Sequence, residues 1–225
     1  MSAPTWTREA SVRAVWARTG ESAEWIAARL DDLVRRASAL TGVQEWRLSD
    51  DSAWRGDPTE LAALVRRHPA GADPAEGFVL SVAGTGPDEV HLNLLVSAGA
   101  THVGSREPAH HLLLSTRPLG EHGLDVAVGD GLCRAVAEAW EPAAVKLTSR
   151  EVNRTARRGG WLAPVGHRVW LHRDVAPHVT PAASVTAEAV GQGTLLAVPD
   201  DWEAPQVVEA VLATYEASGV DTIPH

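Results

Sequence analysis

Helical periodicity marks four segments of this 225-residue chain. In residues 21–40, Ile26, Leu30 and Leu33 recur at the spacing that places side chains on one face of a helix, and polar residues fill the opposite face. Pro58 and Pro205 are suited to a first helical turn and mark where two further helices begin. The pattern therefore predicts four helices, at residues 21–40, 57–68, 123–140 and 205–218.

Shorter segments rich in apolar and β-branched residues, bounded by Gly and Pro, lie between these helices and are typical of strands. They lack the regular strand–helix alternation of a doubly wound sheet, and several follow one another through short turns. We therefore expect a single α+β domain over residues 1–225, with a mainly antiparallel sheet packed with about four helices. The expected strands are residues 11–17, 43–48, 78–83, 89–97, 110–116, 145–148, 167–172, 185–190 and 194–198.

Composition narrows the class of protein. An apolar fraction of 44% with 22% charged residues is typical of a globular chain. The single cysteine, Cys133, excludes an intramolecular disulfide and a multi-cysteine zinc site, and its apolar helical neighbours favour a buried, inert thiol. We find no secretory signal pattern and no run near the roughly 20 apolar residues that span a bilayer. We expect a cytoplasmic protein that does not associate with membranes.

Negative charge is concentrated at the C-terminal end. The chain has 20 basic and 29 acidic residues, a formal net charge of −9, yet residues 176–225 contain seven Asp or Glu and no Lys or Arg. This balance argues against a nucleic-acid-binding protein, because phosphate contacts need clustered cations. Asp200 or Asp201 is placed to cap the last helix. Glu209 and Glu216 share a helix face with no cation three or four residues away, which leaves ordinary solvation and a docking surface equally open.

Known catalytic motifs are missing from the sequence: it has no phosphate-binding P-loop, no H-E-x-x-H zinc pair and no G-x-S-x-G nucleophile elbow. His110 and His111 are adjacent on an expected strand, so their side chains should diverge and cannot chelate one ion together. His172 and Asp174 share a face and could bind a metal with a third ligand from elsewhere. The alternative function is therefore a metal-dependent hydrolase with a dispersed His/Asp site.

One basic cluster stands out. Its members follow helical spacing and would lie along one stripe, which could hold phosphate. Because Glu151 lies within it and aromatic residues are few, a solvated face that pairs with acidic neighbours is the favoured interpretation. The cluster consists of Arg150, Arg154, Arg157 and Arg158.

The order of several short motifs resembles the immunity protein 52 family of bacterial polymorphic-toxin systems. The likeness covers most of the chain, except residues 70–120, and the Arg cluster has no place in it. Trp and Gly residues carry most of the matches. The matching residues are Trp16, Arg29 and Leu30, Gln44-Glu45-Trp46, Ala139-Trp140-Glu141-Pro142, Gly159-Gly160-Trp161-Leu162 and Gly191-Gln192-Gly193-Thr194-Leu195.

This resemblance implies a small cytoplasmic protein that binds and neutralises a cognate toxin domain without being an enzyme. It implies no catalytic residues and no cofactor, and it makes the matched Trp residues architectural. A nuclease toxin, whose substrate groove is basic, would suit an acidic partner. A regulatory protein that binds some other basic surface is a third interpretation, and the oligomeric state is left open. The residues we expect at the toxin-facing surface are Asp200, Asp201, Glu203, Glu209 and Glu216.

Overall fold

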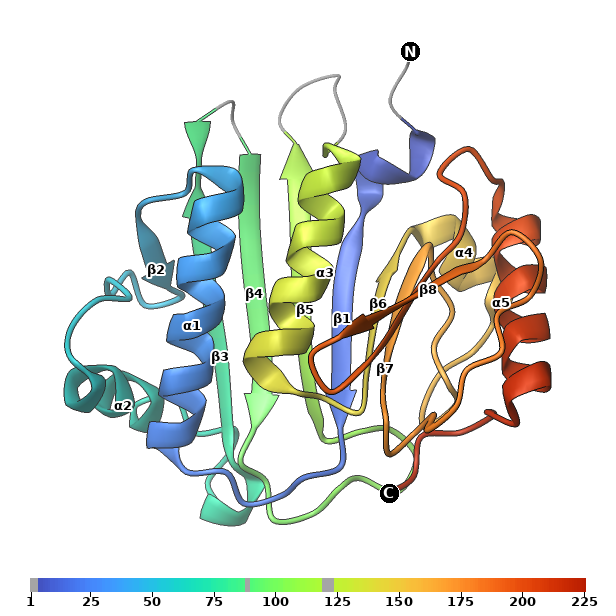
Figure 1. Cartoon of the computed structure of the whole chain (residues 1–225). Coiled ribbons are helices and arrows are strands. Elements are labelled where there is room, and N and C mark those ends of the chain that lie inside the picture. Colours follow the sequence, from blue (N-terminus) through green and yellow to red (C-terminus); the bar gives the residue numbers. More distant parts are fainter. Residues whose placement is uncertain (1–3, 88–89, 119–123) are drawn as a thin grey trace.

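Nine strands form one antiparallel sheet in the computed structural model, which describes residues 4–87, 90–118 and 124–225. Their order across the sheet is β2-β3-β4-β5-β1-β6-β7-β9-β8 (Figure 1). The strand bounds are β1 (Ser11–Trp16), β2 (Trp46–Leu48), β3 (Phe78–Thr85), β4 (Val90–Ala98), β5 (His110–Pro118), β6 (Ala144–Thr148), β7 (Arg168–His172), β8 (Thr186–Val190) and β9 (Gly193–Ala197).

Five α-helices accompany the sheet within the described residues, together with two short 3-10 helices, η1 (Thr5–Glu9) and η2 (Pro74–Glu76). The expected α+β class with an antiparallel sheet in one domain is confirmed, and α4 adds a helix to the expected four. The first residues of the expected segments 89–97 and 123–140 lie outside the described residues. The helices are α1 (Ala23–Thr41), α2 (Pro58–Arg66), α3 (Val126–Trp140), α4 (Arg150–Ala156) and α5 (Ala204–Ser218).

The helix ends follow from capping residues. The Ser22 side chain accepts a hydrogen bond from the Trp25 N–H at the start of α1, and Gly42, with a φ of 73°, ends that helix in the left-handed conformation. At α2, Asp57 accepts from two backbone N–H groups and Glu60 bonds back to the Asp57 N–H, which completes a capping box. These signals explain why the first two helices begin where the sequence predicts.

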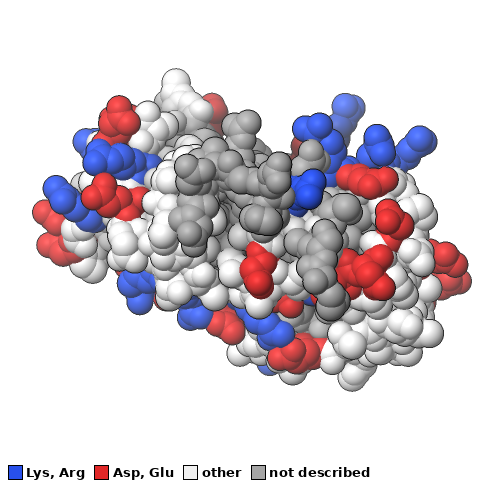
Figure 2. Space-filling view, turned by 90° about the horizontal axis from the view of Figure 1, so that it is seen from above, with Lys and Arg blue, Asp and Glu red and all other residues white. Residues whose placement is uncertain are grey.

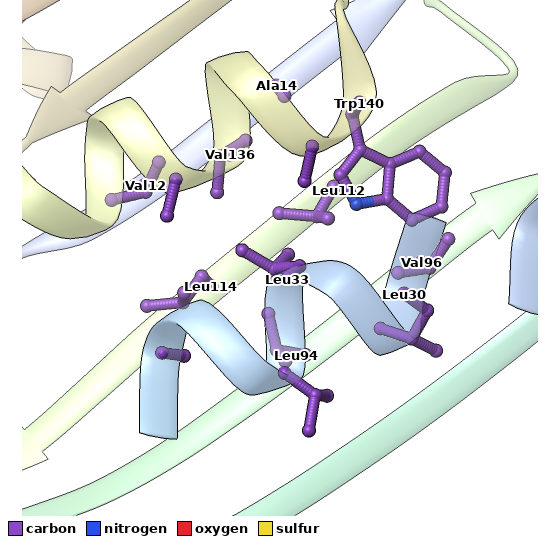
Figure 3. Close-up of a cluster of buried hydrophobic side chains, with 14 of the residues drawn as sticks. Val12, Ala14, Leu30, Leu33, Leu94, Val96, Leu112, Leu114, Val136 and Trp140 are labelled. Atoms are coloured by element: carbon purple, nitrogen blue, oxygen red, sulfur yellow. The ribbon is translucent and has the colours of Figure 1, made fainter. Parts of the chain in front are cut away.

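The larger core lies between one face of the sheet and the helices α1 and α3, which lie side by side over it (Figure 1). Alternate residues of each strand point into it, so that Leu94 of β4 and Leu114 of β5 are fully buried. Figure 3 shows these side chains meeting Leu30 and Leu33 of α1, with Val136 and Trp140 contributed by α3. This core holds β3, β4, β5, β1 and β6 to the two helices.

A second, smaller core lies on the opposite face, mainly over the C-terminal strands, and reaches Val15 at the end of β1. Leu171 of β7 and Leu196 of β9 point into it, and Val207 and Val211 of α5 cover them. Helix α4 packs beside α5 at this end of the sheet (Figure 1). We call the region of β7 and β9, which is buried on both faces, the covered half, and β6 lies at its boundary.

The same face is bare over the other strands. Cross-strand register links Leu196 and Val169 of the covered half to Lys146, Arg13 and Leu113 in one continuous row, so all five side chains belong to one face. Among the described residues no helix packs on this face over β1, β3, β4 and β5, and its side chains there are mostly half-buried. We call this region the open face.

Trp residues are mainly architectural, as expected. Seven of the nine are buried, and the other two, Trp25 and Trp202, are partly buried. Trp16 donates to Glu21 at 2.7 Å and packs on Trp140 with ring centroids 5.1 Å apart, which joins the end of β1 to the end of α3. This arrangement uses the indole as packing area with a satisfied N–H donor.

Candidate functional site

Helix α5 presents acidic residues to solvent because its apolar residues face the sheet. Val207, Val211 and Tyr215 are buried, whereas Glu209 and Glu216 are exposed on another side of the helix. Seven residues of helix separate the two carboxylates by about 10 Å along the axis. No ion pair within the described part of the chain includes either carboxylate, so both remain free to meet an external cation.

Other acidic residues of the C-terminal region are neutralised by arginines from earlier in the chain. Arg134 of α3 donates to both carboxylate oxygens of Glu188, at 2.9 and 2.6 Å, and this contact lowers the Glu188 pKa. Arg158 donates to Asp221 at 2.9 Å. The excess charge seen along the sequence is therefore partly compensated in three dimensions.

Asp200 belongs to a third such contact, around Arg168 of β7, whose side chain is 5% exposed. The guanidinium donates to Asp200 Oδ1 at 2.7 Å and to the carbonyls of His167 and Val198, and its Nε lies 2.7 Å from Asp130 Oδ1. A cation withdrawn from water needs such counter-ions. Of the residues expected at the toxin-facing surface, Asp200 is thus engaged within the chain.

The residues before α5 also differ from expectation. The prediction that Asp200 or Asp201 caps the helix is wrong, because the N-cap residue is Glu203. The Glu203 N–H donates to the Gln206 side chain at 3.0 Å, an arrangement that leaves the Glu203 carboxylate on the surface. Asp201 is exposed as well. Acidic side chains are prominent along the right-hand edge in Figure 2, the side on which α5 lies in Figure 1.

The basic cluster does not form one stripe. Helix α4 ends at Ala156, and Arg157 adopts the left-handed conformation that stops it, with a φ of 48°. Arg158 consequently turns inward and donates to the Ala163 and Asp221 carbonyls. Arg150, Arg154 and Arg157 remain exposed, and Arg154 lies 3.8 Å from Glu151, which fits the expectation of a solvated, acid-paired face.

The residues of the alternative metal site do meet. His172, at the end of β7, places Nδ1 3.3 Å from Asp174 Oδ2, and both residues line a surface pocket of about 220 Å³ together with Glu141. Within the described residues, however, no group of three or more His, Cys, Asp or Glu side chains is arranged to hold a metal ion. The pair is present, and the third ligand that the hypothesis requires is not among those residues.

The remaining candidates behave as the sequence predicts. His110 points into the core and donates from Nε2 to the Ala100 carbonyl at 3.1 Å, whereas His111 lies on the open face, so the two side chains diverge. Burial lowers the pKa of both histidines. Cys133 is fully buried, and burial raises its pKa to about 12, which leaves the thiol inert at neutral pH.

Sequence reasoning missed the open face. The signal was available: the five strands β1, β3, β4, β5 and β6 contain no Asp or Glu in a chain with net charge −9. It was not recognised because the strands are scattered over residues 11–148, and only the sheet order places their outward side chains together. Arg13 of β1 and Lys146 of β6 are cross-strand neighbours on this surface.

Comparisons with known proteins leave the family unassigned. No family model matches the chain, and no curated protein matches it. Among solved structures, the chain is similar to a Pseudomonas aeruginosa T6SS protein named PA0821, with 11% sequence identity and a TM-score of 0.41. The likeness covers 96% of this chain and 66% of that one, so this chain spans slightly under two thirds of the other. At this TM-score the likeness carries no functional argument.

No helix in the described part of the chain combines the length and apolar character needed to cross a membrane.

Proposed function

We propose that this chain is a non-enzymatic immunity protein that binds and neutralises a cognate bacterial toxin domain in the cytoplasm. The resemblance of short motifs in the sequence to the immunity protein 52 family supports the proposal, and burial of the matched Trp residues is consistent with an architectural role. Trp46, Trp140 and Trp161 are all buried. A protein of this kind acts by binding its partner, so its surface must carry a group of residues that is complementary to that partner.

The observation that carries the proposal is the exposed acidic surface of α5. Glu209 and Glu216 remain unpaired within the described residues, whereas Glu188, Asp200 and Asp221 each have an arginine. Unpaired carboxylates on a chain of net charge −9 attract a basic partner at long range and speed association. A nuclease toxin with a basic groove is the partner class this surface fits, with Asp201 and Glu203 at its margin.

The test is co-expression with the toxic C-terminal domain of a large secreted protein encoded beside this gene. The chain should restore growth, and the purified pair should associate. The double variant Glu209→Arg/Glu216→Arg should lower the association rate constant about tenfold and weaken protection, because electrostatic steering acts mainly on that rate.

A matched control keeps the net charge change equal. Glu45→Arg/Glu76→Arg alters two exposed carboxylates outside α5, in the region of β2 and η2 at the other end of the sheet. This control should leave association unchanged. Failure of wild-type protein to bind or protect against the toxin domain counts against the immunity function itself. Equal association by both double variants counts only against α5 as the contact surface.

One observation favours the alternative metal-dependent hydrolase: His172 and Asp174 meet at a pocket that Glu141 also lines. Metal analysis of purified protein separates the two functions. Stoichiometric zinc or manganese that is lost in a His172→Ala variant would favour the hydrolase, and metal-free protein that still protects against the toxin would exclude it.

A further inference from the structure

The open face carries an unusual mixture of side chains. Leu95 of β4 and Leu113 of β5 are cross-strand neighbours near its centre and are only half-buried. Small polar residues surround them on the same face, and Arg13 and Lys146 continue their row toward the covered half. The surrounding polar residues are Ser11, Ser81, Asn93, Ser97 and Ser115. Apolar residues at the centre with polar residues around them are typical of protein–protein contact surfaces.

Arg13 and Lys146 are placed against each other without a counter-ion. They are direct cross-strand partners, and like charges in that position repel. Lys146 Nζ donates to Asn153 Oδ1 at 2.6 Å, which positions the ammonium without neutralising it. Burial, and next the charge of Arg13, lower the Lys146 pKa to about 8. No ion pair among the described residues includes either side chain.

The other cations withdrawn from solvent show how unusual this is. Seven described Arg or Lys residues are half-buried or buried, and five of them contact a carboxylate at 3.4 Å or less. Those five are Arg29, Arg36, Arg134, Arg158 and Arg168. Most partly desolvated cations in the described part of the chain therefore contact a carboxylate. Arg13 and Lys146 are the two that do not.

The surroundings give this pair a defined binding geometry. Arg13 and Lys146 line a small cleft together with Gly159, Gly160, Leu162 and Arg158, and the Arg158 guanidinium already pairs with Asp221. Glu107, in the loop before β5, lies near His111 on the open face, but no carboxylate raises the pKa of Lys146. The pair thus lines a cleft, and Arg13 is the cross-strand neighbour of Leu113 in the apolar centre.

We propose that the open face is a docking surface for a protein partner that presents a carboxylate to Arg13 and Lys146 and an apolar side chain to Leu95 and Leu113. The partner's carboxylate would be the counter-ion of these two cations, which form no ion pair with the described residues of this chain. A nucleic acid fits less well, because the centre of this face is apolar and binding to phosphates needs clustered cations rather than an apolar centre. This surface is opposite in charge to the acidic surface of α5, and the proposal goes beyond the immunity function because it does not require the partner to be a toxin.

Lys146 is the only lysine of the chain, so ¹³C-lysine labelling of the full-length protein yields one side-chain NMR signal that reports directly on the cleft. The probe is a synthetic capped peptide of alternating Glu and Leu residues, titrated at constant pH and ionic strength. The Lys146 signal should shift saturably, and its pKa should rise by about one unit in the presence of saturating peptide, because a nearby carboxylate favours the charged form. The same peptide with Gln in place of Glu should give at least tenfold weaker binding.

Variants locate the effect. Arg13→Gln should weaken the peptide at least fivefold, and Leu113→Ser, which keeps both cations, should also weaken it. The control Arg150→Gln/Arg154→Gln removes two exposed cations of α4 and should leave binding unchanged. Leu113→Ser alone tests the surface if Arg13→Gln fails to fold.

The opposite results overturn the proposal. They are an unmoved Lys146 signal in the presence of millimolar peptide, equal binding by the Gln peptide, or full binding by Leu113→Ser. A DNA duplex that shifts the Lys146 signal at lower concentration than the peptide also overturns it, in favour of a nucleic-acid partner.

Discussion

The covered half and the open face of the sheet differ in burial, although side chains alternate between the two faces along every strand. In β7 of the covered half, Trp170 and Leu171 point to opposite faces and are both about 1% exposed, because α3 lies on one side and α5 on the other. In β5, Leu114 is fully buried under the helices, but its neighbour Leu113 lies half-buried on the open face. Burial of every residue marks a strand covered on both faces, and alternation marks one with a free face.

This difference in burial between β7 and β5 shows which apolar side chains contribute to the core. Leu112, Leu113 and Leu114 are consecutive, and by their composition alone each is a core residue. The helices bury two of them and leave Leu113 available. Leu113 therefore contributes little to the core, and its cross-strand neighbour Arg13 is one of the two cations without a counter-ion.

The largest expected effect is on the free energy of unfolding, and it should differ between a substitution in the covered half and one on the open face. Leu171→Ala should lower the free energy of unfolding by roughly 3 to 5 kcal/mol, because it leaves a cavity in the second core. Leu113→Ala should lower it by about 1 kcal/mol or less, since the side chain is already half exposed to water. Equilibrium urea unfolding measures both. Equal losses would mean that something covers the open face of the free protein.

Ion pairs provide the second contrast. Arg168→Met should destabilise the protein by roughly 3 kcal/mol, because Asp130 and Asp200 lose the buried guanidinium that joins them. Arg134→Met breaks the pair with Glu188, which is 60% exposed, and should cost about 1 kcal/mol or less. The same urea experiment compares them, and a larger loss for Arg134→Met would reverse our view of which contact is structural.

Acid should weaken the protein through its buried histidines. His167, 2% exposed, stacks on Trp6 with centroids 4.6 Å apart, and burial lowers its pKa to about 4. The unfolded chain, with a histidine pKa near 6.5, binds the proton first, so stability falls as the pH drops from about 6.5 toward 4. Between pH 6.5 and 5 the loss from this residue should be about 1.5 kcal/mol.

The variant His167→Phe preserves an aromatic ring on Trp6 and removes this proton. Its free energy of unfolding should depend less steeply on pH below 6.5, with the remaining slope coming from other groups, including His110 and His111, whose pKa values are lowered as well. An unchanged slope in urea unfolding at pH 5 and 6.5 would contradict the assignment to His167.

The smallest effect concerns the open face itself. Arg13→Gln removes a repelling charge, so the Lys146 pKa should rise from about 8 toward its usual value near 10.4. NMR titration of the single lysine measures the change, and stability near pH 7 should move by less than about 1 kcal/mol. Arg154→Gln, which alters an exposed cation of α4, serves as the control and should leave the pKa in place.

The sequence was sufficient for most of the fold, because period and capping are local properties. The helix at 21–40 and the strands at 78–83 and 110–116 were predicted within a few residues of α1, β3 and β5. The candidate surfaces were harder. Arg158 was assigned to a helical stripe, but α4 is only seven residues long and Arg157 ends it, so Arg158 turns inward. A short basic segment carries too little periodicity to show where its helix stops.

By itself the sequence determined the antiparallel α+β class, most of the element order and the acidity of residues 176–225. Tertiary structure decided which of those acidic residues are neutralised within the chain. Glu188, Asp200 and Asp221 find arginines 54, 32 and 63 residues away in the chain, so a local count could not see that they are neutralised. Sheet order likewise made Arg13 and Lys146, 133 positions apart in sequence, cross-strand neighbours, and no ion pair among the described residues includes either side chain. The charge of a segment can be counted from its sequence. Whether that charge is neutralised depends on contacts that form only when distant segments pack together.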